Sequence, residues 1–122
     1  MILWLTGNTG AGKTTIARVL KRPDSIILDG DELRALTNNH DLSKEGRWAH
    51  NLFIAKLAKL LESQGFQIIV SVICPYEELR QQVKAITGCE FIYLSYEGDD
   101  QQPDKPYEKP SCLSICVNTP RS

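Results

Sequence analysis

The stretch that decides the fold occupies residues 7–15 and reads Gly7-Asn8-Thr9-Gly10-Ala11-Gly12-Lys13-Thr14-Thr15. It matches every fixed position of the phosphate-binding pattern G-x-x-x-x-G-K-[ST]. In this pattern the glycines let backbone N–H groups surround a polyphosphate, and the N-terminus of the following helix adds partial positive charge. We therefore predict that the chain binds a nucleoside triphosphate here, with Lys13 reaching the β- and γ-phosphates and Thr14 binding Mg²⁺.

The residues on both sides of this loop indicate a strand followed by a helix. Residues 2–5 form a short apolar run typical of a buried strand, and residues 16–20 continue as a helix. Further strands are expected at 25–29, 67–73, 90–94 and 113–117, and further helices from Asp31, from the N-cap Ser43 to the C′ residue Gly65, and over 76–86. Because strands and helices alternate, we predict an α/β fold with a five-stranded parallel sheet and helices on both faces.

Length and composition exclude several classes of protein. A chain of 122 residues is expected to form one domain, residues 1–122. The formal net charge is −1, and no run of like charges indicates binding to nucleic acid. The first apolar run is too short to cross a bilayer and has no leader before it, so we expect no membrane contact. No C-x-x-C pair occurs among the four cysteines, which favours a reduced, cytoplasmic setting.

The expected sheet brings several chemically useful residues to one edge. Ligands of such sheets bind beyond the carboxyl ends of the strands, where the phosphate loop, Asp29-Gly30-Asp31 and Cys74-Pro75 are expected to meet. The two aspartates have a structural interpretation, a turn with a helix N-cap that Asp31 alone would provide. In the functional interpretation, which we favour, one carboxylate holds a metal-bound water or accepts a proton from an attacking hydroxyl. We prefer Asp31 to Asp29 for this role.

Two arginines and a histidine are candidates for binding a second substrate. Arg34 and Arg47 could be ordinary solvated charges, but a planar guanidinium suits a phosphate or sulfate, and both lie on elements that begin near the crevice. His50 follows Arg47 by about one helical turn and therefore shares its face. From the residues alone, His50 can be either a structural histidine or a hydrogen-bond donor to a substrate.

Together these motifs resemble those of the adenylylsulfate kinase family. The resemblance includes W-x-T-G at residues 4–7, the phosphate loop, and L-D-G-D-x-x-R at residues 28–34. Residues 42–47 are similar to the family's F-S-x-x-D-R, and residues 71–76 are similar to its S-F-I-S-P-Y. The likeness is continuous from Ile2 to about Val83 and returns faintly at residues 107–110 and 117–119.

The resemblance implies an activity, a strand order and a set of roles. The family transfers the γ-phosphoryl group of ATP to the 3′-hydroxyl of adenylylsulfate with Mg²⁺, on a sheet of order 2-3-1-4-5. By this resemblance Lys13 and Asp31 are catalytic, and Thr14 and Asp31 bind the metal. His50 stands where the family usually has an acceptor-contacting Asn, and Cys74 replaces a Ser. The residues assigned to the substrate are Asp29, Arg34, Arg47, His50, Ile73 and Cys74.

The chain departs from the family after Tyr96. The family has a lid there, with basic residues and an aromatic side chain that stacks on the acceptor's adenine, whereas we expect only an irregular loop over residues 97–110. The C-terminal helix of the family is also missing, so the chain is either a naturally short form or a piece of a longer protein. We expect an open site, and apolar surface near the last strand that favours a homodimer.

These departures leave three functional hypotheses. The first is a kinase acting on adenylylsulfate, a small-molecule nucleotide acceptor, and it is favoured by Arg34 and Arg47. The second is a kinase with another hydroxyl acceptor, such as a nucleotide, a sugar or a nucleic-acid end, and it is favoured by the missing lid and by His50. The third is an ATP-binding regulatory module with little turnover; Asp31 argues against it, because binding alone needs no carboxylate aimed at the γ-phosphate.

Overall fold

A computed structural model describes residues 1–7, 13–96, 108 and 115–119 of the chain. In these ranges the elements follow one another as β1 (Ile2–Thr6), α1 (Lys13–Leu20), β2 (Ser25–Asp29), α2 (Gly30–Thr37), α3 (Lys44–Glu62), β3 (Gln67–Ser71), α4 (Glu77–Thr87), β4 (Glu90–Tyr96) and β5 (Ile115–Thr119). None of the helices in this part of the chain combines the length and the apolar character that crossing a bilayer demands.

The strands form a parallel sheet with β1 at its centre. The order is β2-β3-β1-β4-β5, which confirms the arrangement implied by the family resemblance. On one side of β1, Leu5 is opposite Ser71 of β3, and on the other side Leu3 is opposite Glu90 of β4. All five residues of β3 are buried, as expected for a central strand covered on both faces. The carboxyl ends of β1, β2 and β3 therefore lie at one edge.

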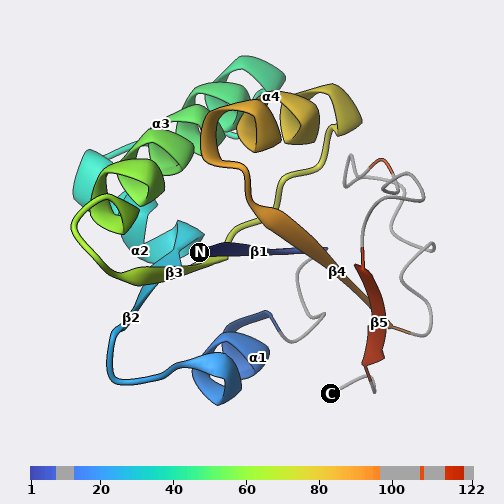
Figure 1. The fold of residues 1–122 in the computed structure, drawn as a ribbon. Coiled ribbons are helices and arrows are strands. Elements are labelled where there is room, and N and C mark those ends of the chain that lie inside the picture. Colours follow the sequence, from blue (N-terminus) through green and yellow to red (C-terminus); the bar gives the residue numbers. More distant parts are fainter. Residues whose placement is uncertain (8–12, 97–107, 109–114, 120–122) are drawn as a thin grey trace.

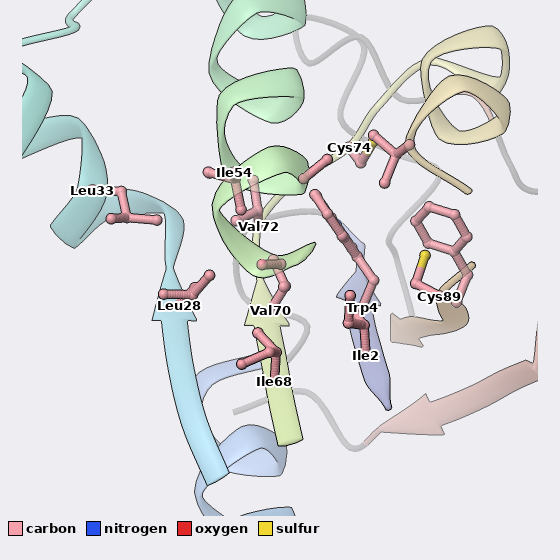
Figure 2. Packing of buried hydrophobic residues seen from close by; sticks show 14 of the residues in the cluster. Ile2, Trp4, Leu28, Leu33, Ile54, Ile68, Val70, Val72, Cys74 and Cys89 are labelled. Atoms are coloured by element: carbon pink, nitrogen blue, oxygen red, sulfur yellow. The ribbon is translucent and has the colours of Figure 1, made fainter. Parts of the chain in front are cut away.

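Helices cover both faces of the sheet, as predicted. Figure 1 shows α3 and α4 over one face and α1 over the other. Successive residues of a strand point to opposite faces, so Trp4 and Val70 join the larger core cluster with Ile54 of α3, shown in Figure 2. Their neighbours Leu5 and Ile69 pack in a smaller cluster with Ala17, Ile16 and Leu20 of α1. The phosphate-loop helix thus has a core of its own beneath the sheet.

Several element boundaries differ from the sequence prediction. Helix α2 begins at Gly30, one residue early, because Asp29 is its N-cap. Ser43 caps α3 as predicted, with its Oγ accepting a hydrogen bond from the Gly46 N–H at 3.1 Å. Gly65 was predicted as the C′ residue of α3 and has a positive φ of 97°, but the C-cap is Ser63, so Gly65 lies one residue beyond the observed C′ position.

The carboxyl ends of β3 and β4 also differ from the predicted ends. Strand β3 ends at Ser71 rather than at residue 73, because the backbone beyond it leaves the ladder and is bound by side chains from other elements. Strand β4 continues past Leu94 to Tyr96. Apart from Glu108, the irregular loop predicted over residues 97–110 lies outside the described residues.

Candidate active site

The two described ends of the phosphate loop are joined by the motif lysine. Gly7 follows β1 and is buried, with a φ of 148° in the region that favours glycine. Lys13 begins α1, is half-buried, and its Nζ donates a hydrogen bond to the Gly7 carbonyl at 2.9 Å. The residues between them, Asn8, Thr9, Gly10, Ala11 and Gly12, lie outside the described part of the chain. The predicted strand and helix on either side of the loop are both present.

Thr14, the residue at the [ST] position of the motif, contacts the end of β2. The Thr14 hydroxyl donates a hydrogen bond to Asp29 Oδ2 at 3.3 Å. The other oxygen, Asp29 Oδ1, accepts the backbone N–H groups of Asp31 at 2.9 Å and Glu32 at 3.4 Å. The capping role that the sequence made available to Asp31 is therefore filled by Asp29, and one carboxylate links α1 to the start of α2.

Asp31 is exposed in the first turn of α2, close to this contact but not engaged in capping. The Thr14 hydroxyl and the Asp29 and Asp31 carboxylates are the hard oxygen donors that Mg²⁺ prefers, and Mg²⁺ is usually held by one or two carboxylates together with substrate phosphates. The described residues contain no group of three or more His, Cys, Asp or Glu side chains suited to a metal. The donor set fits Mg²⁺ bound with a triphosphate.

On the other side of the edge, α2 and α3 bring the two predicted arginines close together. Arg34 Nη1 donates to the carbonyls of Asn39 at 3.1 Å and Asp41 at 3.3 Å, and Arg47 Nε donates to the Leu42 carbonyl at 2.8 Å. Partial burial, and next the positive charge of Arg47, lower the pKa of Arg34. The two guanidinium groups thus bind neighbouring carbonyls, those of Asp41 and Leu42, and guanidinium groups of this kind suit an anion.

His50 is buried beside these arginines. Only 3% of the residue is exposed, and its Nε2 donates to the Gly30 carbonyl at 3.1 Å. Burial, and next the charge of Arg34, lower the pKa of His50, so the ring is neutral at pH 7. The contact with Gly30 ties α3 to the first residue of α2, directly before Asp31. One of its two ring nitrogens is therefore used within the protein.

The end of β3 places the two remaining predicted residues differently. Ile73 is half-buried, whereas the Cys74 side chain is fully buried in the larger core cluster, where burial raises the pKa of its thiol. Cys74 can therefore contribute only its backbone to a site. The structure also reveals Asn51, which the sequence reasoning missed: its Nδ2 donates to the carbonyls of Arg47 at 2.9 Å and Ile73 at 3.3 Å. Its position four residues after Arg47 was the only available signal.

An aromatic stack connects α3 to the chain after β3. The rings of Trp48 and Tyr76 stack with centroids 5.9 Å apart, and Lys44 Nζ lies 5.6 Å and 5.2 Å from these two centroids. A hollow of about 460 Å³ adjoins Trp48 and contains none of the predicted site residues; its lining is Lys44, Glu45, Trp48, Ala49 and Leu52. The predicted acceptor residues thus do not line this apolar hollow.

The order of the parallel sheet, the motif lysine at the start of α1 and its contact with the end of β1, and the carboxylate at the end of β2 that contacts Thr14 define an α/β P-loop kinase fold. A family model described as adenylylsulphate kinase matches residues 1–102. The chain therefore belongs to the adenylylsulfate kinase family, a family of ATP-dependent kinases.

Two curated relatives carry different names. The probable adenylyl-sulfate kinase of Archaeoglobus fulgidus is 40% identical over 90 residues, covering 68% of this chain and 58% of that protein. The cytidine diphosphoramidate kinase of Campylobacter jejuni is 41% identical over 93 residues, covering 68% of this chain and 55% of that protein. The matched region thus spans little more than half the length of these relatives, and it does not distinguish one acceptor from another.

A solved structure shares the fold over nearly the whole chain. The adenylylsulfate (APS) kinase of Mycobacterium tuberculosis, in complex with AMPPNP and APS, aligns with a TM-score of 0.84 over 99% of this chain and 89% of that one. Its sequence identity of 23% means that the likeness concerns the fold alone.

Proposed function

We propose that this chain is an ATP-dependent kinase that transfers the γ-phosphoryl group of ATP to the 3′-hydroxyl of adenylylsulfate. The observation that carries the proposal is the meeting of two kinds of site at one edge of the sheet. Lys13 and the Thr14–Asp29 contact form a phosphate side, and the close pair Arg34 and Arg47 forms a positive acceptor side. Asp31 lies between them, at the start of the helix that carries Arg34.

Each residue has a role that its position supports. Lys13 would neutralise and orient the transferred phosphoryl group, within the cradle expected from residues 7–15. Thr14 and Asp31 would hold Mg²⁺, with Asp29 as the alternative carboxylate because it contacts Thr14. Bound there, Mg²⁺ supplies neutralisation of phosphate charge. Asp31 would accept the proton of the attacking hydroxyl, while Arg34 and Arg47 bind the anionic part of the acceptor.

A second candidate is a kinase of the same mechanism with a different nucleotide as acceptor. Two observations favour it: the relative named for cytidine diphosphoramidate is as similar as those named for adenylylsulfate, and His50 stands where the family usually has Asn. A buried neutral ring presents different hydrogen-bonding groups from an amide, so this position suits discrimination between acceptors.

The deciding experiment measures ADP release from ATP and Mg²⁺ with each acceptor in turn. We expect release that depends on adenylylsulfate, with a lower kcat/KM for cytidine diphosphoramidate. Release that depends on the cytidine compound and not on adenylylsulfate would establish the second candidate. Binding of ATP without stimulation by any acceptor would instead support a regulatory module.

A further inference from the structure

Three successive carbonyl groups at the end of β3 are each bound by a different part of the chain. The Ile73 carbonyl accepts from Asn51 Nδ2 of α3 at 3.3 Å, and the Cys74 carbonyl accepts from Arg80 Nη1 of α4 at 2.6 Å. The Pro75 carbonyl accepts from the backbone N–H of Glu108 at 2.7 Å. These carbonyls lie beyond the last ladder residue, Ser71, so other partners must satisfy them. The course of the chain here depends on those partners.

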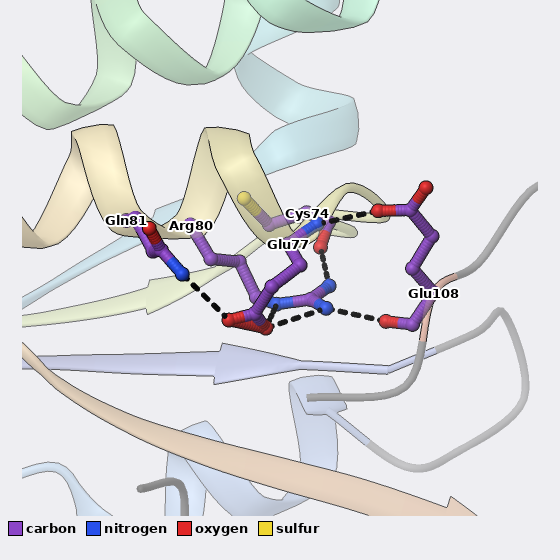
Figure 3. A network of polar contacts seen from close by, with 5 residues as sticks. All are labelled: Cys74, Glu77, Arg80, Gln81 and Glu108. Carbon is purple, nitrogen blue, oxygen red and sulfur yellow. Dashed lines mark hydrogen bonds and ion pairs between the residues drawn. The ribbon is translucent and has the colours of Figure 1, made fainter. Parts of the chain in front are cut away.

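Arg80 is the buried centre of this arrangement, and Figure 3 shows its contacts with Cys74, Glu77 and Glu108. Only 2% of the residue is exposed, although it carries a charge. Its Nε and Nη2 lie 3.2 Å and 3.0 Å from Glu77 Oε1, and its Nη2 also donates to the carbonyl of Glu108. A buried guanidinium is tolerated only with such partners, so its position, and that of the Cys74 carbonyl, is held firmly.

Glu108 closes the arrangement from a distant part of the sequence. Its backbone contacts Pro75 and Arg80. Its side-chain Oε1 accepts a hydrogen bond, at 2.8 Å, from the N–H of Glu77, the first residue of α4. The N-cap residue of α4, Tyr76, provides no side-chain hydrogen bond. A carboxylate that lies 31 residues further along the chain therefore caps this helix, where negative charge is favoured.

We propose that Glu108 and Arg80 are positioning residues for the acceptor, acting through the backbone of Ile73 and Cys74. This inference rests on the proposed function, in which the end of β3 lines the acceptor site. Three backbone or side-chain contacts of Glu108 and the charge of Arg80 hold this strand end in place. The phosphate side is built instead on β1, α1 and the end of β2. Removing the contacts of Glu108 therefore weakens acceptor binding and leaves ATP binding intact.

The test compares Glu108→Ala and Glu108→Gln with the control Glu78→Ala, which removes an exposed carboxylate from the same turn of α4. We expect Glu108→Ala to speed amide hydrogen exchange at Glu77 by at least about tenfold, because the N–H loses its cap. We also expect it to raise the acceptor KM by about tenfold, with the ATP KM changed by less than about twofold. Glu108→Gln, which keeps an acceptor oxygen without the charge, gives intermediate values, and Glu78→Ala changes neither readout.

The possible outcomes distinguish a failure of the positioning role from a failure of the proposed kinase function. Turnover with an unchanged acceptor KM in Glu108→Ala overturns the positioning role alone. An equal rise in both KM values also overturns it, since it shows general loosening of the fold. Unchanged exchange at Glu77 contradicts the cap itself. No acceptor-dependent turnover in the unaltered chain overturns the proposed function, and the positioning role with it.

Discussion

The proposed phosphate side and the proposed acceptor side of this protein are built in different ways. On the phosphate side, the contacts join residues that are close in sequence: Lys13 and Gly7 are 6 residues apart, and Thr14 and Asp29 are 15 apart. On the acceptor side, the contacts of the two arginines are local, since Arg47 and Leu42 are 5 residues apart. The buried contacts there join more distant residues: His50 and Gly30 are 20 apart, and Arg80 and Glu108 are 28 apart. The phosphate side thus lies within residues 7–31, whereas the acceptor side also depends on contacts of α3 and α4 with other parts of the chain.

Burial separates the two sides as well. Thr14 and Asp31 are exposed, whereas His50, Asn51 and Arg80 are at most 3% exposed. Exposed oxygens beside a loop suit a hydrated metal and a triphosphate that enters from solvent. Buried polar groups depend on partners within the fold, and the partners of these three side chains include the backbone carbonyls of Gly30, Ile73 and Cys74. We therefore expect substitutions on the phosphate side to affect chemistry, and those on the acceptor side to affect specificity or stability.

The largest expected effect comes from Lys13→Ala. Removing the charge from the phosphates should lower kcat by at least about a hundredfold and weaken ATP binding strongly. Steady-state kinetics and ATP titration measure both, with Lys21→Ala, which removes an exposed lysine just after α1, as the control. Unchanged ATP affinity and activity in Lys13→Ala would show that the phosphate-binding pattern has no such role here.

The two aspartates test how chemistry and structure are divided at the end of β2. Asp31→Asn should lower kcat by about a hundredfold with little change in unfolding temperature, because Asp31 is exposed and does not cap α2. Asp29→Asn keeps a capping oxygen, whereas Asp29→Ala removes it and should cost about 1 kcal/mol of stability. A greater loss of kcat in Asp29→Asn than in Asp31→Asn would reverse the roles that we assign.

Arg34→Ala and Arg47→Ala test the acceptor side. Each removes a charged donor from the positive pair, so the acceptor KM should rise by about tenfold or more while the ATP KM changes much less. Arg18→Ala, on the exposed face of α1, is the matched control. If the ATP KM rises as much as the acceptor KM, the arginines serve both substrates and the division into two sides fails.

The smallest expected effect is the dependence of stability on pH. The folded protein holds His50 with a lowered pKa, so the unfolded chain binds more protons as the pH falls below about 6.5. His50 therefore lowers the unfolding free energy on acidification by at most about 1.4 kcal/mol per pH unit, until the folded form also protonates. The loss begins near the unfolded pKa and is absent at neutral pH and above.

The chain offers a matched pair of histidines for this measurement. His40 is exposed, with its Nε2 3.0 Å from Asn38 Oδ1. Denaturant unfolding at pH 7.0 and 5.5 should show a smaller difference in His50→Gln than in the unaltered chain, and no change in His40→Gln. The same slope in all three proteins would mean that other groups determine the pH dependence.

The amino-acid sequence was enough to predict the fold class and the strand and helix around the phosphate loop. Alternating apolar runs reflect the local periodicities of strands and helices, and the spacing of glycine and lysine reflects a local backbone shape. The parallel sheet with β1 at its centre followed from these patterns and the family resemblance, and is confirmed. The roles of Lys13, Thr14 and Asp31 remain predictions that rest on this motif.

Only the tertiary structure showed which side chains satisfy which backbone groups. Asp29 rather than Asp31 caps α2, because the turn between β2 and α2 brings its Oδ1 to two N–H groups. Cys74 faces the core, and Glu108, which follows β4 in the sequence, caps α4. Such contacts depend on how separate elements pack against one another, and neither periodicity nor motif spacing contains that information. The sequence by itself therefore determined the fold class and the place at which phosphate chemistry is predicted, and the packing of separate elements decided which groups meet on the proposed acceptor side.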